Sequence, residues 1–348
     1  VYKRQTPDNS VHTFDGDTLA WTRSYDPEPV GNYVIDTDLW TTTVNDNPWA
    51  AHTFDNVVFL PDQNQLLVMT SPLHNYAGKS AVGIGVVAQQ TWLYDIASNS
   101  WLFLKSAGTP STNYEYGLWA KGLVYDPGLG KVIGSGRDKN FMFDPATQTW
   151  SSVASNDDGH DIHATAEYNH VTQQSFLFGG VVTLPNRITS YDPVLSRWQE
   201  VPTTGITPAQ AEGGKIAMDT LNDVLISVSV LENQNSYYNT SGESQTLILD
   251  LHTMRWTVAD LGFTPRNWGF GFAMGYLAKF DVSLFLTQRY ELGIGPVPEM
   301  WAFRYGPDID NDGVPDAEDN CPRIPNPGQE NTNGGERGDA CHTLPTGC

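Results

Sequence analysis

The segment Phe143-Asp144-Pro145-Ala146-Thr147-Gln148-Thr149-Trp150 recurs along the chain in altered form, and this recurrence decides the fold. In each copy an aromatic or aliphatic residue precedes Asp, and Trp follows six residues after that Asp. The other copies are Tyr94-Asp95 with Trp101, Tyr191-Asp192 with Trp198, and Leu249-Asp250 with Trp256. Repetition with a period of roughly 40 to 60 residues is typical of folds built from one repeated unit.

Each copy predicts two strands joined by a tight turn. Asp144 and Pro145 favour a turn in which the Asp side chain caps backbone N–H groups, and Trp150 opens the next strand on its buried face. A second pair of strands precedes this turn, as at residues 174–180. Four short strands form a twisted antiparallel sheet that is stable only between copies of itself, and radial stacking of such sheets predicts a β-propeller.

The repeated units resemble kelch repeats. The resemblance is carried by Gly179-Gly180 after a run of strand residues, by the Tyr/Phe-Asp turn with its Trp, and by a His in the first strand at His52 and His163. The Gly doublet is replaced by Thr70-Ser71 and by Ser135-Gly136 in two other units. The resemblance implies a propeller of the kelch type.

Counting the units predicts six blades. The sixth begins near Phe270 and ends at Tyr305 after three strands. The first blade is predicted at residues 12–45. The second ends near residue 106 and carries a long insertion at 72–90. The third, fourth and fifth are predicted at 117–154, 161–202 and 211–259.

The fourth strand of the sixth blade is predicted at the other end of the chain. Residues 1–7 precede the quartet His12-Thr13-Phe14-Asp15 much as residues 40–47 precede a second such quartet at 52–55. They therefore look like an outer strand without its own blade, and pairing them with the strand near Trp301 closes the ring without an exposed edge. The alternative is that the N-terminus frays and the ring closes by packing alone.

Composition narrows the classes of function. The chain has 348 residues, is 39% hydrophobic and 11% aromatic, and contains 32 Gly and 22 Pro, which suits many short strands and turns. No run of about 18 apolar residues exists, so no membrane span is expected. The net charge of −21 comes from 40 acidic and 19 basic residues. It argues against nucleic acid and anionic lipid as binding partners and favours the binding of cations. No signal peptide is visible at the start, which indicates a mature or trimmed chain.

A change in composition predicts a propeller domain over residues 1–306 and an irregular tail over 307–348. From Asp308 onward the tail places carboxylates at alternate positions around Gly313, and hard oxygen ligands at that spacing suit Ca²⁺. An EF-hand is excluded, because Pro315 lies inside the segment and no helix can follow it. The alternative is an acidic, solvated linker without metal.

The tail resembles a thrombospondin type 3 repeat, whose pattern continues through Asn326-Pro327-Gly328-Gln329 to Gly338-Asp339-Ala340-Cys341. The resemblance implies one Ca²⁺ and a disulfide between Cys321 and Cys341. The implied ligands are the Val314 carbonyl and the carboxylates of Asp308, Asp310, Asp312, Asp316 and Asp319. The second half departs from the family, which usually has Asp where this chain has Asn331, Asn333 and Gly335.

The cysteines indicate the compartment. All three lie in the tail, and Cys348 is left for another chain, a further C-terminal segment or no partner at all. A disulfide requires an oxidising environment. The expected location is therefore extracellular, either secreted or at the cell surface, with the periplasm as the alternative.

The loops at one mouth of the propeller hold the candidate ligand-binding residues. These are Tyr116, Trp119, Arg137, His163, Glu212, Arg266, Trp268 and Arg289. His160 and His163, near Asp157 and Asp158, could form a transition-metal site. Residues three apart on a strand point to opposite faces, however, and His163 matches His52, so a structural imidazole is the preferred interpretation.

Two functions remain open. The preferred one is a binding or adhesion propeller that recognises a glycan or an extracellular protein, with the Ca²⁺-stabilised tail as a stalk. The alternative is an extracellular carbohydrate-active enzyme of lyase, hydrolase or epimerase type, in which arginines bind substrate carboxylates and Glu212 or a His moves protons. A copper-radical oxidase of the galactose oxidase type is excluded. Its copper site needs a tyrosine cross-linked to a cysteine, and no cysteine precedes Cys321 in this chain. The fold alone supports neither function.

Overall fold

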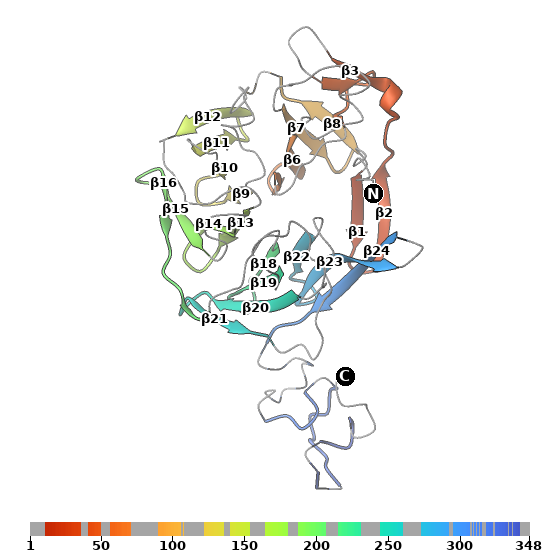
Figure 1. The fold of residues 1–348 in the computed structure, drawn as a ribbon, viewed down its shortest axis with the longest axis vertical. Coiled ribbons are helices and arrows are strands. Elements are labelled where there is room, and N and C mark those ends of the chain that lie inside the picture. Colours follow the sequence, from red (N-terminus) through yellow and green to blue (C-terminus); the bar gives the residue numbers. More distant parts are fainter. Residues whose placement is uncertain are drawn as a thin grey trace. The chain divides into compact units, whose positions relative to one another are not determined.

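The structure is a computed structural model of the chain. The residues that it describes are 11–35, 41–49, 56–70, 90–105, 107, 122–135, 140–153, 164–179, 187–206, 215–230, 244–259, 273–291, 295–306, 308, 310, 312, 314, 318–322, 324–332, 334–335 and 337–341. These residues form 24 β-strands and one 3₁₀ turn at Val30–Asn32, and none of them lies in an α-helix (Figure 1). The prediction of an all-β chain is confirmed.

The chain divides into two compact units. The first comprises Val1–Thr203 with Pro208–Gly214, and the second comprises Thr204–Thr207 with Lys215–Cys348. The first unit holds three sheets of four strands, and the second holds one sheet of five strands and one of three. Successive antiparallel sheets of this size have the form of β-propeller blades.

Each blade of the first unit has its strands in chain order, joined by antiparallel hairpins. The first blade consists of β5 (Val57–Leu60), β6 (Gln65–Thr70), β7 (Gln90–Asp95) and β8 (Ser100–Phe103). The second consists of β9 (Leu123–Asp126), β10 (Lys131–Ser135), β11 (Asn140–Asp144) and β12 (Thr149–Val153). The third consists of β13 (Thr165–Asn169), β14 (Gln174–Phe178), β15 (Ile188–Asp192) and β16 (Arg197–Glu200).

Neighbouring blades of the first unit pack through their first strands, with β5 beside β9 and β9 beside β13. Buried apolar residues of the first two blades form one core cluster, which includes Leu67 and Phe143. A second cluster joins the second and third blades and includes Ile133 and Leu177. Each sheet therefore buries apolar surface against its neighbour, which is the reason for the repetition in the sequence.

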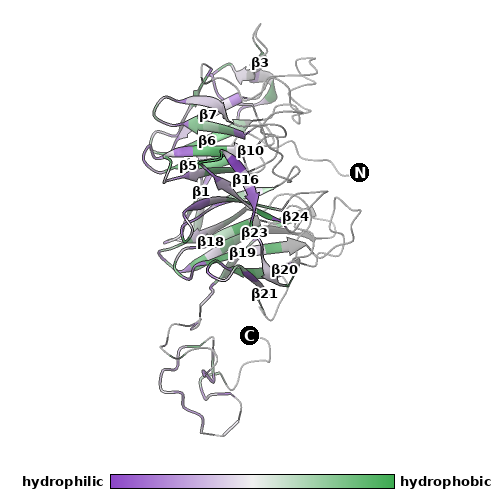
Figure 2. Ribbon diagram, turned by 90° about the vertical axis from the view of Figure 1, so that its left-hand side faces the viewer, coloured by the Kyte–Doolittle hydropathy of each residue, from purple (hydrophilic) through white to green (hydrophobic). Residues whose placement is uncertain are grey.

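The second unit holds the two remaining blades. Its strands are β17 (Thr204–Gly205), β18 (Lys215–Asp219), β19 (Val224–Val230), β20 (Ser244–Asp250), β21 (Arg255–Val258), β22 (Ala273–Leu277), β23 (Val282–Glu291) and β24 (Gly295–Phe303). β17 pairs in parallel with β21, and β18 packs beside β22. Figure 2 shows the hydrophobic colouring of β19, which lies next to the first strand of its blade, β18. Among the described residues, the last blade stops after its third strand, β24, as predicted.

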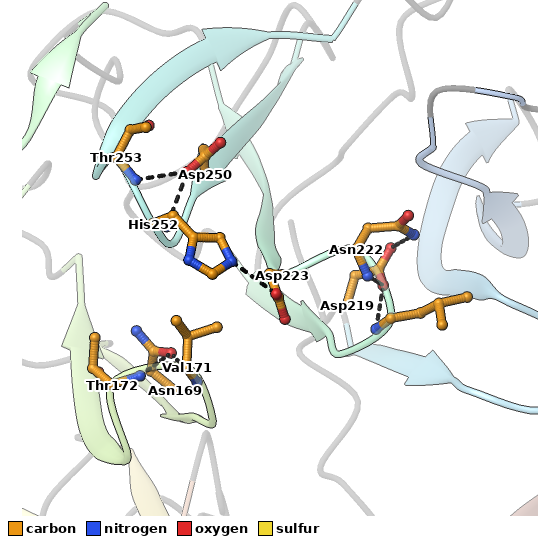
Figure 3. A network of polar contacts seen from close by, with 10 residues as sticks. Asn169, Val171, Thr172, Asp219, Asn222, Asp223, Asp250, His252 and Thr253 are labelled. Atoms are coloured by element: carbon orange, nitrogen blue, oxygen red, sulfur yellow. Dashed lines mark hydrogen bonds and ion pairs between the residues drawn. The ribbon is translucent and has the colours of Figure 1, made fainter. Parts of the chain in front are cut away.

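The Asp-initiated turns share one geometry. The Asp carboxylate accepts hydrogen bonds from backbone N–H groups two or three residues later, as Asp192 Oδ1 does from Val194 at 2.9 Å and Leu195 at 3.0 Å. Figure 3 shows the same cap at Asp250. The residue four positions after the Asp adopts a positive φ, and these residues are Asn99, Gln148, Ser196 and Met254. This cap explains why Asp recurs at the turn.

The recurring Trp joins two blades. Trp198 lies opposite Tyr191 in the strand register, with ring centroids 5.4 Å apart. Its Nε1 donates to Asn140 Oδ1 of the preceding blade at 3.0 Å. In the same way, Trp150 Nε1 donates to Thr91 Oγ1 of the blade before it at 2.8 Å. The indole therefore closes its own hairpin and also anchors the hairpin to the neighbouring sheet.

The prediction of six blades is wrong, because residues 12–45 do not form a blade. They form two separate two-stranded sheets, β1 (Val11–Asp15) with β2 (Ala20–Tyr25) and β3 (Tyr33–Ile35) with β4 (Thr41–Thr43). The described residues therefore contain five blades.

Two prolines lie in the segment between β2 and β3. Pro27 and Pro29 have no N–H to donate, so the ladder of β2 is not continued through this segment. Glu28 lies between them and collects five side-chain donors: Thr43 Oγ1 at 2.6 Å, Asn47 Nδ2 at 2.7 Å, Asn45 Nδ2 at 2.9 Å, Asn32 Nδ2 at 3.1 Å and Tyr25 Oη at 3.2 Å. Burial raises the pKa of Glu28, but hydrogen bonds from these asparagines and from Thr43 leave that pKa below its ordinary value. The segment folds around this carboxylate.

The β1–β2 hairpin has the form of an outer hairpin of a blade. Phe14 pairs with Trp21, which lies six residues after Asp15, and their ring centroids are 5.2 Å apart. Phe143 and Trp150 show the same separation of 5.2 Å in a complete blade. The prediction that this segment starts a blade is therefore wrong, because its pairing matches the last two strands of a blade and not the first two.

Several predicted features lie outside the described residues. They are the closing strand at 1–7 and residues 72–89 of the long insertion, and both stay predictions. In the part of the chain that the structure describes, no helix has the length and apolar character needed to cross a membrane.

Candidate metal centre

Three aspartates of the tail gather their carboxylates in one place. Oxygen atoms of Asp308, Asp310 and Asp312 all lie within 4.8 Å of one another, and each residue is half-buried. The backbone folds around them, because Asp312 N–H donates to Asp308 Oδ1 and to Asp310 Oδ1 at 3.2 Å each. The N–H of Val314 donates to Asp312 Oδ1 at 2.9 Å. The alternation of Asp in the sequence thus becomes a cluster of oxygen atoms.

The cluster is electrostatically strained. Burial raises the pKa of Asp310, and the nearby negative charges of Asp312, Asp319 and Asp308 raise it further. No lysine or arginine occurs in residues 307–319 to offset these charges. Carboxylates gathered in this way favour a bound cation.

Asp319 places a fourth carboxylate near the cluster, where its charge raises the pKa of Asp310. The side chain of Asp319 is only 9% exposed. Its Oδ1 atom accepts from the N–H of Cys321 and from Gln329 Nε2, both at 2.7 Å, whereas its Oδ2 atom is buried and has no hydrogen-bond partner. Asp310 Oδ2 is buried and unpartnered in the same way. Buried polar atoms are usually paired, so these two oxygen atoms are candidates for contact with a ligand.

The second half of the tail holds the cluster in place. A disulfide joins Cys321 to Cys341. The N–H of Gly338 donates to the Asn320 carbonyl at 2.9 Å, and the N–H of Asn326 donates to Asp312 Oδ2 at 2.7 Å. The carboxylate of Asp312 in the cluster and that of Asp319 near it are therefore both oriented by residues that follow the first cysteine.

The donor set determines which ion could fit. Among the described residues, the side chains of this cluster offer only carboxylate oxygen atoms, with neither imidazole nor thiolate groups. Carboxylates and carbonyls suit Ca²⁺ or Mg²⁺, whereas Zn²⁺ and Cu²⁺ favour nitrogen and sulfur. The irregular backbone suits the flexible coordination of Ca²⁺ better than the strict octahedron of Mg²⁺.

The structure places part of the predicted site. It brings the carboxylates of Asp308, Asp310 and Asp312 together, with Asp319 near Asp310 and the N–H of Val314 bonded to Asp312. The predicted disulfide is present. The remaining predicted residues lie outside the described residues: Asp316, Cys348, Tyr116, Trp119, Arg137, His163, Glu212, Arg266 and Trp268. Arg289 belongs to β23, but its side chain is outside the description.

Sequence reasoning missed Gln329 and Asn326 as partners of the aspartates. Both stand in the segment Asn326-Pro327-Gly328-Gln329, which carried the family resemblance without a role for its side chains. Gln329 reaches Asp319 across ten residues. A contact of that kind depends on the path of the loop, so local spacing gives no signal for it.

A second polar cluster lies where β24 leads toward the tail. Asn222 Nδ2 donates to Asp219 Oδ2 at 2.9 Å, to Asp281 Oδ1 at 3.3 Å and to the carbonyl of Tyr305 at 2.9 Å; the Asp219 contact is drawn in Figure 3. Tyr276 Oη donates to Asp281 Oδ1 at 2.8 Å. Burial, and then the hydrogen bond to Asp281, raise the pKa of Tyr276 far above its ordinary value. The cluster is hydrogen-bonded internally, which indicates a structural role.

This raised pKa predicts a loss of stability in alkali. The neutral phenol of Tyr276 stabilises the folded state below the unfolded pKa of about 10, and the contribution is lost as pH rises toward the folded pKa. Tyr276→Phe should cost about 1 kcal/mol at neutral pH through the lost hydrogen bond. The difference in melting temperature between parent and variant should shrink between about pH 8 and about pH 11. Circular dichroism melts measure it, and a difference independent of pH would contradict the assignment.

Comparison with known proteins identifies part of the tail. The family of the thrombospondin type 3 repeat matches residues 307–329. The matched stretch contains the three-aspartate cluster, Asp319 and Gln329. The resemblance predicted for the tail is thereby confirmed over these residues, whereas the kelch resemblance stays a prediction. No match to the chain was found among curated proteins.

Proposed function

We propose that the tail binds a Ca²⁺ ion. The proposed ligands are the Val314 carbonyl and the carboxylates of Asp308, Asp310, Asp312, Asp316 and Asp319. One observation carries the proposal: the buried Oδ2 atom of Asp319 has no hydrogen-bond partner, although Asp319 stands close enough to Asp310 to raise its pKa. Bound Ca²⁺ would supply the positive charge that offsets the repulsion among these carboxylates.

We also propose that the protein acts outside the cell, as a binding propeller with a Ca²⁺-stabilised stalk. The disulfide and the thrombospondin type 3 match support this location. Ca²⁺ sites of extracellular modules work at roughly 0.1 to 1 mM, a concentration that the cytosol does not reach. The partner in this proposal is a glycan or an extracellular protein, held by the loops at the propeller mouth that the sequence analysis identified.

Calcium titration of the chelator-treated protein tests the first proposal. Isothermal titration calorimetry should detect binding to the parent protein. Asp319→Asn keeps the shape of the side chain and removes its charge. This change should weaken Ca²⁺ binding by more than about 100-fold, because even outer-shell partners of metal ligands contribute 10- to 100-fold. Limited proteolysis should find the tail protected by Ca²⁺ in the parent protein and not in the variant.

Asp26→Ala is the matched control for this titration. It also removes one carboxylate, but Asp26 is exposed and its nearest charged partner is Arg23 at 3.4 Å. Its Ca²⁺ affinity should equal that of the parent. Absence of Ca²⁺ binding to the parent protein, or equal affinities for Asp319→Asn and the parent, would overturn the proposed ligand set.

A further inference from the structure

The side chain of Gln329 fixes the orientation of Asp319. We propose that Gln329 is the positioning residue of the calcium site: it holds Asp319 Oδ1 so that Oδ2 faces the bound ion. This inference rests on the proposed function, since it assigns a role toward the same ion. It concerns a residue that contributes no ligand atom of its own.

The hydrogen bonds leave one orientation for the Gln329 amide. The backbone N–H of Asn320 can only donate, and it lies 2.7 Å from Gln329 Oε1. The Asp319 carboxylate can only accept while it is ionised, and its Oδ1 lies 2.7 Å from Gln329 Nε2. A second acceptor, the Asn326 carbonyl, lies 3.2 Å from the same nitrogen. Both ends of the amide are therefore matched to the chemistry of their partners.

The backbone of Gln329 is fixed as well. Its N–H donates to the Asn326 carbonyl at 2.8 Å, and its own carbonyl accepts from Asn320 Nδ2 at 2.9 Å. The residue adopts a positive φ of 53°, and its side chain contacts residues 319 and 320. A side chain held at the backbone and at both ends of its amide is pre-organised before any ion arrives.

The two carboxylate oxygen atoms of Asp319 therefore have different roles. Oδ1 already accepts from Gln329 and from the N–H of Cys321, whereas Oδ2 is buried without a partner. The carboxylate cannot rotate without breaking both hydrogen bonds. Oδ2 is thus the atom that remains for a cation, and hydrogen bonds of this outer kind orient ligands in metal sites generally.

The inference also couples the calcium site to the disulfide loop. Gln329 lies inside the loop that Cys321 and Cys341 close, at a sequence separation of 20. The loop therefore contributes to the site through an amide, although the ligand carboxylates precede it in the sequence. Thus, the second half of the repeat has a role even where the Asp residues typical of the family are absent.

Two variants test the role of Gln329. Gln329→Ala should weaken Ca²⁺ binding by about 10- to 100-fold in calorimetry, the range found when outer-shell partners are removed. Gln329→Met keeps most of the side-chain volume, removes the hydrogen bonds and should behave alike. Gln199→Ala is the matched control, because Gln199 Nε2 also donates to an aspartate, Asp192 Oδ2, at 2.7 Å, but in a blade. Its Ca²⁺ affinity should equal that of the parent.

A double-mutant cycle separates positioning from a general effect on the loop. If Gln329 acts through Asp319, then adding Gln329→Ala to Asp319→Asn should cause no further loss of affinity. Eu³⁺ luminescence lifetimes in H₂O and D₂O should also reveal an additional bound water in Gln329→Ala, where Asp319 has left the ion. A full further loss in the double variant, or parental affinity in both Gln329 variants, would overturn the inference. A parent protein that binds no Ca²⁺ would instead overturn the proposed function and the inference together.

Discussion

Alanine in place of Gly122 is expected to lower the melting temperature of the protein by about 5 to 10 °C, because overpacking costs about 1 to 3 kcal/mol or more. Gly122 immediately precedes β9, the first strand of the second blade, and is buried. A Cβ atom at this position would lie 2.4 Å from the backbone nitrogen of Ala166 and 2.6 Å from its Cβ. Ala166 belongs to β13, so the clash falls between the first strands of two neighbouring blades. Neither backbone can move without opening the interface between the blades.

Gly275→Ala is the matched control for this prediction. Gly275 also belongs to a first strand, β22, but a Cβ atom there would meet no heavy atom within 4 Å. This change should leave stability within about 1 kcal/mol of the parent, and it can even stabilise, since Gly loses more backbone freedom than Ala on folding. Differential scanning calorimetry compares the two. Equal melting temperatures for both variants would show that the first strands are not packed as described.

Loss of the disulfide is expected to disorder the tail and to weaken Ca²⁺ binding by more than about 10-fold, since it frees an outer-shell partner of Asp319. In the double variant Cys321→Ser with Cys341→Ser, the open chain regains about 3 kcal/mol of conformational freedom. The N–H of residue 321 then no longer stands fixed 2.7 Å from Asp319 Oδ1, and Gln329 is released with the loop. Calorimetry gives the affinity, and hydrogen exchange gives the order of the tail.

Cys348→Ser serves as the control for the disulfide variant. It removes the third cysteine and leaves the Cys321–Cys341 bond in place. Its Ca²⁺ affinity and exchange rates should match those of the parent protein. If the double variant also matched the parent, the loop would have no part in shaping the site.

The sequence was informative wherever a structural rule is local. Asp192 and Trp198 stand at a fixed spacing because the turn cap and the opposing aromatic pair both lie within one hairpin. The cluster of Asp308, Asp310 and Asp312 could be predicted for the same reason, since its members alternate along one short segment.

Predictions failed where a contact joins distant residues or where one local rule overrides another. The spacing from Asp15 to Trp21 is that of an outer hairpin. The His-Thr-Phe-Asp quartet, however, predicted the start of a blade at the same place. Glu28 accepts hydrogen bonds from residues as distant in the sequence as Asn47, and a pattern of strand residues does not predict such a hydrogen-bonded carboxylate. The role of Gln329 could not be predicted from the sequence, because its contact with Asp319 spans part of a disulfide loop.

Two prolines in β24 bear on how the protein avoids aggregation. Pro296 and Pro298 pair in register with Tyr290 and Gln288 of β23, and among the described residues β23 is the only strand paired with β24. Because proline has no N–H, it fits positions where the nitrogen faces away from the paired strand. The outward side of β24 therefore lacks donors at residues 296 and 298, which lie before the part near Trp301 where residues 1–7 are predicted to pair, and a strand from another molecule would find no continuous ladder at that end. Prolines at these positions disfavour growth by strand addition at this end of β24.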